Sequence, residues 1–263
     1  MTALALLAFV PLIMWLAQTA LLKRHGLGVR WRLDSGDSPA VVREAGRIVT
    51  QVTLSAVAVA YPLLIGEGVA EYYARLLPLN DSMADFGQGA ALATLFLSVF
   101  YLVWLVTDQV RVAPHLDRRR TMRKLAIVPF SAIFGALVEE IVFRGIVMAD
   151  LLRSAALTDG SAVVLSAAIF AAAHYVRAVK RRWTILGHFM LGLMLCAAFL
   201  ETGNLWLAAG LHAGGILVIM GARPVLKYRG PAWLTGASIF PYAGVVGIAG
   251  LATLTAIVSE YAR

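Results

Sequence analysis

The sequence predicts an all-α fold, a polytopic membrane bundle of about eight transmembrane helices. Composition is the first indication: 60% of the 263 residues are hydrophobic and only 14% are charged, roughly half of the charged fraction of soluble domains. The second indication is the mean hydropathy of +0.78. The third is that basic connections alternate along the chain with connections that have few or no basic residues. No stretch is polar enough to form a second domain, so residues 1–263 should be one integral membrane domain.

Eight apolar segments are each about long enough to cross a hydrocarbon core of roughly 30 Å as a helix rising about 1.5 Å per residue. They lie at residues 2–22, 48–66, 89–107, 125–149, 161–179, 184–201, 205–221 and 237–259. Only residues 202–204 separate the sixth segment from the seventh, which predicts a tight helical hairpin. Two longer polar stretches, 23–47 and 67–88, are long enough to hold short interfacial helices.

The basic residues alternate between the connections, which supports the count of eight. Most of the 23 Lys and Arg residues lie in the first, third, fifth and seventh connections. The positive-inside rule therefore predicts that these connections are cytoplasmic, with both termini outside the cytoplasm, in the cell inner (plasma) membrane. The basic residues that give the chain its net charge of +8 are therefore expected to lie beside anionic lipid headgroups. The lipid bilayer is the expected partner, and nucleic acid is not.

Three charged side chains lie inside the fourth segment: Glu139, Glu140 and Arg144. Each costs about 2.5–3.5 kcal/mol at the centre of a spanning helix, so three unpaired charges would cost roughly 8–10 kcal/mol. Glu140 and Arg144 are four residues apart and can pair on one helix face, whereas Glu139 lies about 100° away. Two neighbouring carboxyls in unequal surroundings ionise unequally, which suits one of them to acid–base work. The alternative is an ion pair that only fixes helix packing.

Two histidines lie in other apolar segments, His174 in the fifth and His212 in the seventh. Three alanines separate His174 from Phe170, and Gly210 and Gly214 flank His212, so both helices offer small residues for close packing. A glutamate with a histidine can hold and deprotonate a water for attack on a carbonyl, and a second histidine can donate to the developing oxyanion. Glu and His are also zinc ligands, so metal-free and metal-assisted water both stay open. The alternative is two histidines that only hydrogen-bond within the packing.

The remaining histidines and the single cysteine have weaker positions. His25 and His115 lie in basic connections and His188 near the start of the sixth segment, so all three are expected at the interface or in solvent. His188 is the one of the three that could also line the site. Cys196 stands alone in an apolar run, so it forms no intramolecular disulfide and offers no cysteine-based metal site.

The order of these motifs resembles the CAAX protease and bacteriocin-processing (CPBP) family of intramembrane glutamic endopeptidases. The motifs are Glu139-Glu140-xxx-Arg144, Phe170-xxx-His174 and His212, in a core of residues 125–220. The resemblance implies eight helices and hydrolysis of a peptide bond in a membrane-associated protein or peptide. No organic cofactor is expected, and a divalent metal ion stays open. It also implies that Glu139 activates water that His174 shares, and that His212 stabilises the oxyanion. Glu140 and Arg144 would be orienting or structural partners.

One position departs from that family. Its last motif usually has Asn or Asp four residues after the histidine, where this chain has Ile216. Half of the expected oxyanion-binding pair is therefore missing, and loss of one such donor costs on the order of 10²–10³ in rate. Two other functions stay open: a non-catalytic scaffold or immunity protein of the same fold, and a small proton-coupled transporter, because buried Glu and His also serve proton relays.

The predicted spans place Glu139 and His174 at different depths. His174 lies about five residues, and Glu139 about fourteen, from the cytoplasmic end of its own segment, which is a difference of over ~10 Å at the rise of an α-helix. A fourth helix that begins near Pro129, with residues 121–128 in the interface, would bring the two depths together. We therefore expect that start, since proline suits the first turn of a helix.

Overall fold

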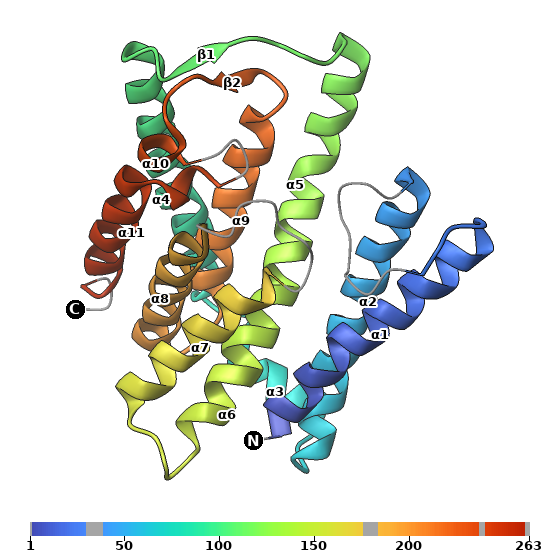
Figure 1. Cartoon of the computed structure of the whole chain (residues 1–263). Helices are drawn as coiled ribbons and strands as arrows, with labels where there is room; N and C mark the ends of the chain where they lie inside the picture. The colour runs from blue at the N-terminus through green and yellow to red at the C-terminus, as the bar shows by residue number, and fades with distance from the viewer. Residues whose placement is uncertain (1, 30–38, 176–183, 237–239, 261–263) are drawn as a thin grey trace.

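The computed structural model describes residues 2–29, 39–175, 184–236 and 240–260. These residues form a bundle of helices with one small two-stranded ladder (Figure 1). Five helices are long and apolar enough to cross a membrane, and three shorter apolar helices accompany them. The predicted class, a helical membrane bundle, is confirmed.

The eight apolar helices follow the order of the eight predicted segments. They are α1 (Thr2–Arg24), α2 (Ala40–Leu64), α4 (Met83–Val106), a continuous unit of α5 (Arg118–Glu140), η1 (Ile141–Met148) and α6 (Ala149–Leu152), then α7 (Asp159–Ala173), α8 (Ile185–Thr202), α9 (Trp206–Ala222) and α11 (Val245–Val258). The predicted hairpin joins α8 to α9 through Gly203, whose φ of 66° lies in the left-handed region that glycine adopts without strain.

The expected helix start near Pro129 is wrong. α5 begins at Arg118, after Asp117, whose Oδ1 accepts a hydrogen bond from the Arg120 backbone nitrogen at 2.8 Å. The α5–η1–α6 unit has 35 residues and is about 50 Å long, which exceeds the hydrocarbon core. The depth conflict disappears because this long helix can extend its basic first turns out of the membrane. α7 also ends at Ala173, which puts His174 at its carboxyl end; the last predicted residues of that span lie outside the described residues.

The last predicted span is also shorter than expected. α11 begins at Val245, whereas residues 237–239, where the span was predicted to begin, lie outside the described residues. Ahead of α11 come α10 (Ala232–Thr235) and η3, a single 3₁₀ turn (Pro241–Ala243). Residues 241–243, which were predicted inside a lipid-crossing helix, therefore form a compact turn instead.

The two polar stretches differ in structure. The second holds α3 (Val69–Leu76), the short helix expected there, and the buried hydroxyl of Tyr72 donates to the Gly145 carbonyl oxygen. In the first stretch, the described residues from Ala40 onward extend α2 without a break. An unpredicted antiparallel ladder joins β1 (Val110–Val112) to β2 (Leu226–Tyr228), so the third and seventh connections lie at the same end of the bundle (Figure 1).

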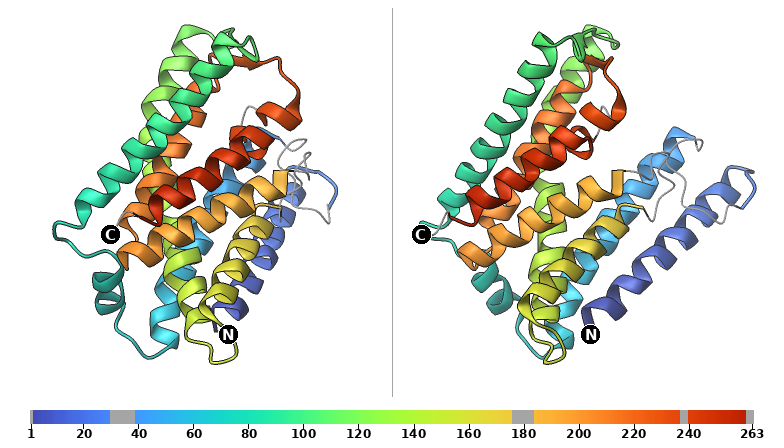
Figure 2. Two further views of the ribbon diagram at one scale, coloured as in Figure 1. Left: turned by 90° about the vertical axis from the view of Figure 1, so that its left-hand side faces the viewer. Right: turned by 60° about the vertical axis from the view of Figure 1, so that its left-hand side comes forward.

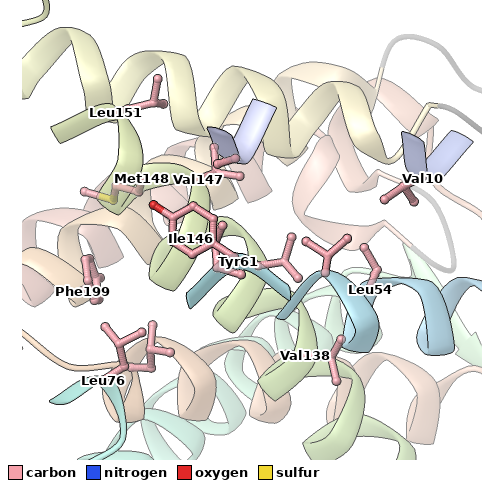
Figure 3. Close-up of a cluster of buried hydrophobic side chains, with 14 of the residues drawn as sticks. Val10, Leu54, Tyr61, Leu76, Val138, Ile146, Val147, Met148, Leu151 and Phe199 are labelled. Carbon is pink, nitrogen blue, oxygen red and sulfur yellow. The ribbon is translucent and has the colours of Figure 1, made fainter. Parts of the chain in front are cut away.

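The amino-terminal helices are held to the bundle by an apolar cluster (Figure 3). Val10 of α1 and Leu54 and Tyr61 of α2 belong to the same buried cluster as Ile146 of η1. Asp150 of α6 adds a polar anchor, because its carboxylate accepts hydrogen bonds from the Ala3 backbone nitrogen and the Tyr61 hydroxyl, both at 3.2 Å. The helix that carries the acidic pair is thus supported on this side by α1 and α2.

On the other side, α4 and α9 lie against each other, as both views of Figure 2 show. A Cβ atom added to Gly210 would lie 2.2 Å from the Phe86 carbonyl oxygen, and one added to Gly214 would lie 2.5 Å from the Ala90 carbonyl oxygen. The predicted small-residue surface is confirmed, with α4 as its partner. His212 lies between these two glycines, so the same contact fixes its position.

Gly210→Ala is expected to destabilise the fold by about 1–3 kcal/mol, because the added methyl group overpacks a backbone contact. Gly221→Ala on the same helix is the matched control, since a Cβ there meets nothing within 4 Å. It should be neutral or stabilise by up to about 1 kcal/mol, as alanine favours the helix. Thermal unfolding of both purified variants in detergent checks this, and equal behaviour of the two would contradict the packing.

Candidate active site

The two adjacent glutamates end α5 in unequal surroundings. The Glu140 side chain is completely buried, whereas 25% of the Glu139 side chain is exposed. After them the helix widens into η1, a π-helix, a rare form that is frequently found at functional sites. Arg144 lies in η1, and its Nη1 is 3.2 Å from Glu140 Oε1. The predicted pair therefore forms, and Glu139 is left outside it.

Arg144 is completely buried and links three helices. Its Nη2 donates to the Gly192 carbonyl oxygen of α8 at 3.0 Å, and its Cζ lies 4.5 Å from the centre of the Phe170 ring of α7, a cation–π contact. Gly192 also lets α8 lie close to α7, because it has no side chain: a Cβ there would be 3.0 Å from Ala167 Cα of α7. Within the described part of the chain, Arg144 Nε and Glu140 Oε2 have no hydrogen-bond partner.

His212 connects the two glutamates. Its Nδ1 is 2.7 Å from Glu140 Oε1; a carboxylate paired with Arg144 can only accept, so Nδ1 carries a hydrogen. Its Nε2 is then directed to Glu139, 3.7 Å from Oε2. Two carboxylates and one guanidinium leave a net negative charge, which a second proton on His212, at Nε2, would neutralise.

His174 approaches the same oxygen from α7. Its Nδ1 is 2.8 Å from the Phe170 carbonyl oxygen, which can only accept, so the neutral ring has its lone pair on Nε2. This Nε2 lies 3.8 Å from Glu139 Oε2. Both histidine nitrogens are too far from that oxygen for a direct hydrogen bond, yet close enough for a single water to bridge. The five candidate residues are therefore brought together.

Glu139 and His174 lie between two cavities. The first, of about 210 Å³, is also lined by residues of α4, α8, α11 and the turn η3, and by residues of α9 that include His212. The second, of about 480 Å³, lies among α1, α2, η1 and α7. Both are lined mainly by aliphatic and aromatic side chains. The arrangement exposes one carboxylate and one imidazole to an apolar ligand on either side.

His188 is not at the interface or in solvent, and that expectation is wrong. It is 1% exposed, and its ring centre lies 4.6 Å from that of His174. Its Nδ1 is 3.0 Å from the Thr184 carbonyl oxygen, and its Nε2 is 3.1 Å from the Tyr242 hydroxyl. His25 and His115 are exposed, as expected.

Two features of this site have no signal in the sequence. Tyr242 lies in the predicted span 237–259, where an aromatic residue is unremarkable, and no local pattern indicates the π-helical turns of η1.

Ile216, the departure from the family, lines the first cavity together with His212. Within the described residues, no group of three His, Cys, Asp or Glu side chains is arranged to hold a metal ion.

Comparison with known families gives one match. Residues 121–216 match the family model described as Type II CAAX prenyl endopeptidase Rce1-like. The match confirms the resemblance found from the motifs, and it includes all five candidate residues as well as Ile216. Comparisons with curated proteins and with solved structures gave no significant match.

Proposed function

We propose that this protein is an intramembrane endopeptidase of the CAAX type, which hydrolyses a peptide bond with water activated by Glu139. The observation that carries the proposal is that His174 and His212 approach one oxygen of Glu139, at 3.8 and 3.7 Å, inside an apolar bundle. The match of residues 121–216 to a prenyl endopeptidase family supports the class of reaction.

The proposed reaction begins with a water held between Glu139 Oε2 and His174 Nε2. The carboxylate takes one proton, and the water oxygen attacks the carbonyl carbon of the scissile bond. The carbonyl oxygen becomes an oxyanion, to which a protonated His212 donates from Nε2. When the carbon–nitrogen bond breaks, the amine takes the proton from Glu139, and the products are a new carboxyl group and an amine.

Glu139 suits the role of base better than Glu140. The Glu140 carboxylate is already engaged by Arg144 and His212, at 3.2 and 2.7 Å, and its side chain is fully buried. Glu139 faces both cavities and has no hydrogen bond in the described part of the chain that would compete with water. In this proposal Glu140 and Arg144 orient His212 and do not touch the substrate.

We also propose a membrane-bound substrate that presents an apolar or lipidated carboxyl-terminal segment. The family name indicates prenylated termini, and the two mainly apolar cavities beside Glu139 could receive such a chain. The proposed orientation of the protein in the membrane follows from its basic connections, which face the cytoplasm by the positive-inside rule. The site opens to the same side, so the substrate is a cytoplasmic or membrane-embedded terminus.

The test uses purified protein in liposomes with a quenched fluorescent peptide that ends in a farnesylated CAAX sequence, its unprenylated counterpart, and a peptide library read by mass spectrometry. Cleavage by the unaltered protein should be lost in Glu139→Ala and in His174→Ala. His115→Ala is the matched control and should cleave normally, because this exposed histidine lies in the connection between β1 and α5 and lines neither cavity. Cleavage that neither site variant affects would contradict the proposal.

A further inference from the structure

The first cavity contains a fourth polar side chain besides those of Glu139, His174 and His212. This cavity has seventeen described lining residues, and the fourth polar one is Tyr242. The remaining thirteen are aliphatic residues, phenylalanines, methionines and one glycine. This tyrosine comes from η3, the turn ahead of α11, which neither the motifs nor the family match includes. Among the lining residues that the structure describes, its hydroxyl is therefore the one side-chain donor besides the two histidines.

The backbone that carries Tyr242 is closely packed on two glycines. A Cβ on Gly187 of α8 would lie 2.7 Å from Ala243 Cα, and a Cβ on Gly247 of α11 would lie 2.5 Å from Tyr242 Cα. Because any side chain at either glycine would displace the turn, these contacts fix η3 against both helices. Tyr242 is thus presented to the cavity from a rigid position, as a group that must meet a reacting atom requires.

A hydrogen bond also positions the Tyr242 hydroxyl. Its oxygen is 3.1 Å from His188 Nε2, and His188 Nδ1 is 3.0 Å from the Thr184 carbonyl oxygen. Since that carbonyl can only accept, the neutral His188 carries its hydrogen on Nδ1, and Nε2 accepts from Tyr242. The hydroxyl hydrogen can rotate, and a charged oxygen is a stronger acceptor than a neutral imidazole.

The tetrahedral intermediate of the proposed reaction needs such a donor. His212 supplies one hydrogen bond from Nε2, and one turn further along α9 Ile216 presents only hydrocarbon to the same cavity. A second donor is worth on the order of 10²–10³ in rate at an oxyanion. No other lining side chain of this cavity in the described residues can provide it.

We propose that Tyr242 donates its hydroxyl hydrogen bond to the oxyanion, as the second donor beside His212. This inference rests on the proposed function, because it requires a tetrahedral intermediate at Glu139. The proton remains on Tyr242 throughout: the hydroxyl turns from His188 to the oxyanion as charge develops, and returns when the carbon–nitrogen bond breaks. His188 acts as a positioning residue that holds the tyrosine between turnovers.

Tyr242→Phe removes the hydroxyl and keeps the ring. We expect kcat for the peptide cleaved by the unaltered protein to fall about 10²–10³-fold, with KM changed less than about threefold. The unfolding temperature should fall by only a few degrees, because the buried His188 Nε2 loses its hydrogen-bond donor. Tyr228→Phe is the matched control, since it also removes a hydroxyl hydrogen bond, to Tyr101 at 3.3 Å, but in β2, outside the cavity. It should cleave as the unaltered protein does.

A rescue variant separates an oxyanion donor from a structural tyrosine. Ile216→Asn in the Tyr242→Phe background introduces an amide donor one turn after His212, and we expect it to raise kcat at least tenfold over Tyr242→Phe alone. The same substitution in the unaltered protein should raise kcat by a smaller factor, because one donor is already present. A tyrosine that only supports packing would give no such coupling between the two positions.

The outcomes are distinguishable from failure of the proposed function. If the unaltered protein cleaves, Glu139→Ala does not, and Tyr242→Phe keeps the full rate, then the oxyanion role of Tyr242 is wrong and the proteolytic function stands. Loss of rate in Tyr242→Phe with no gain from Ile216→Asn also contradicts the donor role. Absence of cleavage by the unaltered protein, or cleavage independent of Glu139, overturns both proposals together.

Discussion

Glu139→Gln is expected to lower kcat by about 10²–10⁴-fold, the usual contribution of a positioned general base, with the fold intact. Glutamine can still hold a water by hydrogen bonds, but it cannot accept the proton that the attacking water must lose. The nearest ring nitrogens of His174 and His212 are 3.8 and 3.7 Å away, so the change breaks no close hydrogen bond. Stability should therefore change little, and single-turnover cleavage together with thermal unfolding measures both quantities.

The control for this prediction is Glu71→Gln, which makes the same chemical change at an exposed position of α3. It should leave both the rate and the unfolding temperature unchanged. If Glu139→Gln cleaves at the normal rate, another group takes the proton. In that case Glu139 is not the general base, and its position beside His174 and His212 serves only the packing of the helices.

The order of the eight apolar segments and the pairing of Glu140 with Arg144 could both be predicted because each depends on short stretches of chain. The hydropathy of about twenty consecutive residues is summed to recognise a span. The eight segments are therefore found even where their predicted first or last residues are wrong. The pair follows from a spacing of four on a helix. The requirement that buried charges find partners then brings His212 into the site, where its Nδ1 is 2.7 Å from Glu140.

The remaining features depend on contacts between distant segments. The start of α5 was misplaced because Pro129 was interpreted as a first-turn residue, whereas it lies inside the helix, where membrane helices tolerate proline. His188 was assigned to the interface from its place near a span end, although its neighbours come from α7 and η3. Tyr242 depends on glycines at 187 and 247, sixty residues apart, whose close approach no local pattern indicates.

The site combines a fixed part and an accessible part. The fixed part consists of Glu140, Arg144 and His212, whose side chains are 0%, 0% and 8% exposed. Their hydrogen bonds join α5, η1, α8 and α9. Glu139 and His174 keep 25% and 28% of their side-chain surface. A protein that only needed to pack these helices would have no reason to leave one carboxylate and one imidazole open to two cavities.

For Glu140, which belongs to the fixed part, we expect a loss of stability that we do not expect for Glu139. Glu140→Gln is expected to destabilise the protein by about 3–5 kcal/mol, because it leaves the buried Arg144 guanidinium without a counter-charge. The matched double variant Glu140→Gln with Arg144→Met removes both charges, and a buried pair replaced by uncharged groups of similar size is often neutral in stability. Thermal unfolding of the double variant should therefore return most of the way to that of the unaltered protein.

Cleavage should not return with stability in the double variant. A glutamine oxygen can still accept from His212 Nδ1, but it carries no negative charge to stabilise a second proton on that ring. The donor at Nε2 is therefore lost from the oxyanion, and kcat stays low. Measured on the same preparations, restored unfolding with a persistent loss of kcat supports an orienting role for Glu140. Full recovery of kcat would show that the ion pair serves packing alone, and that His212 needs no carboxylate to act on the reaction.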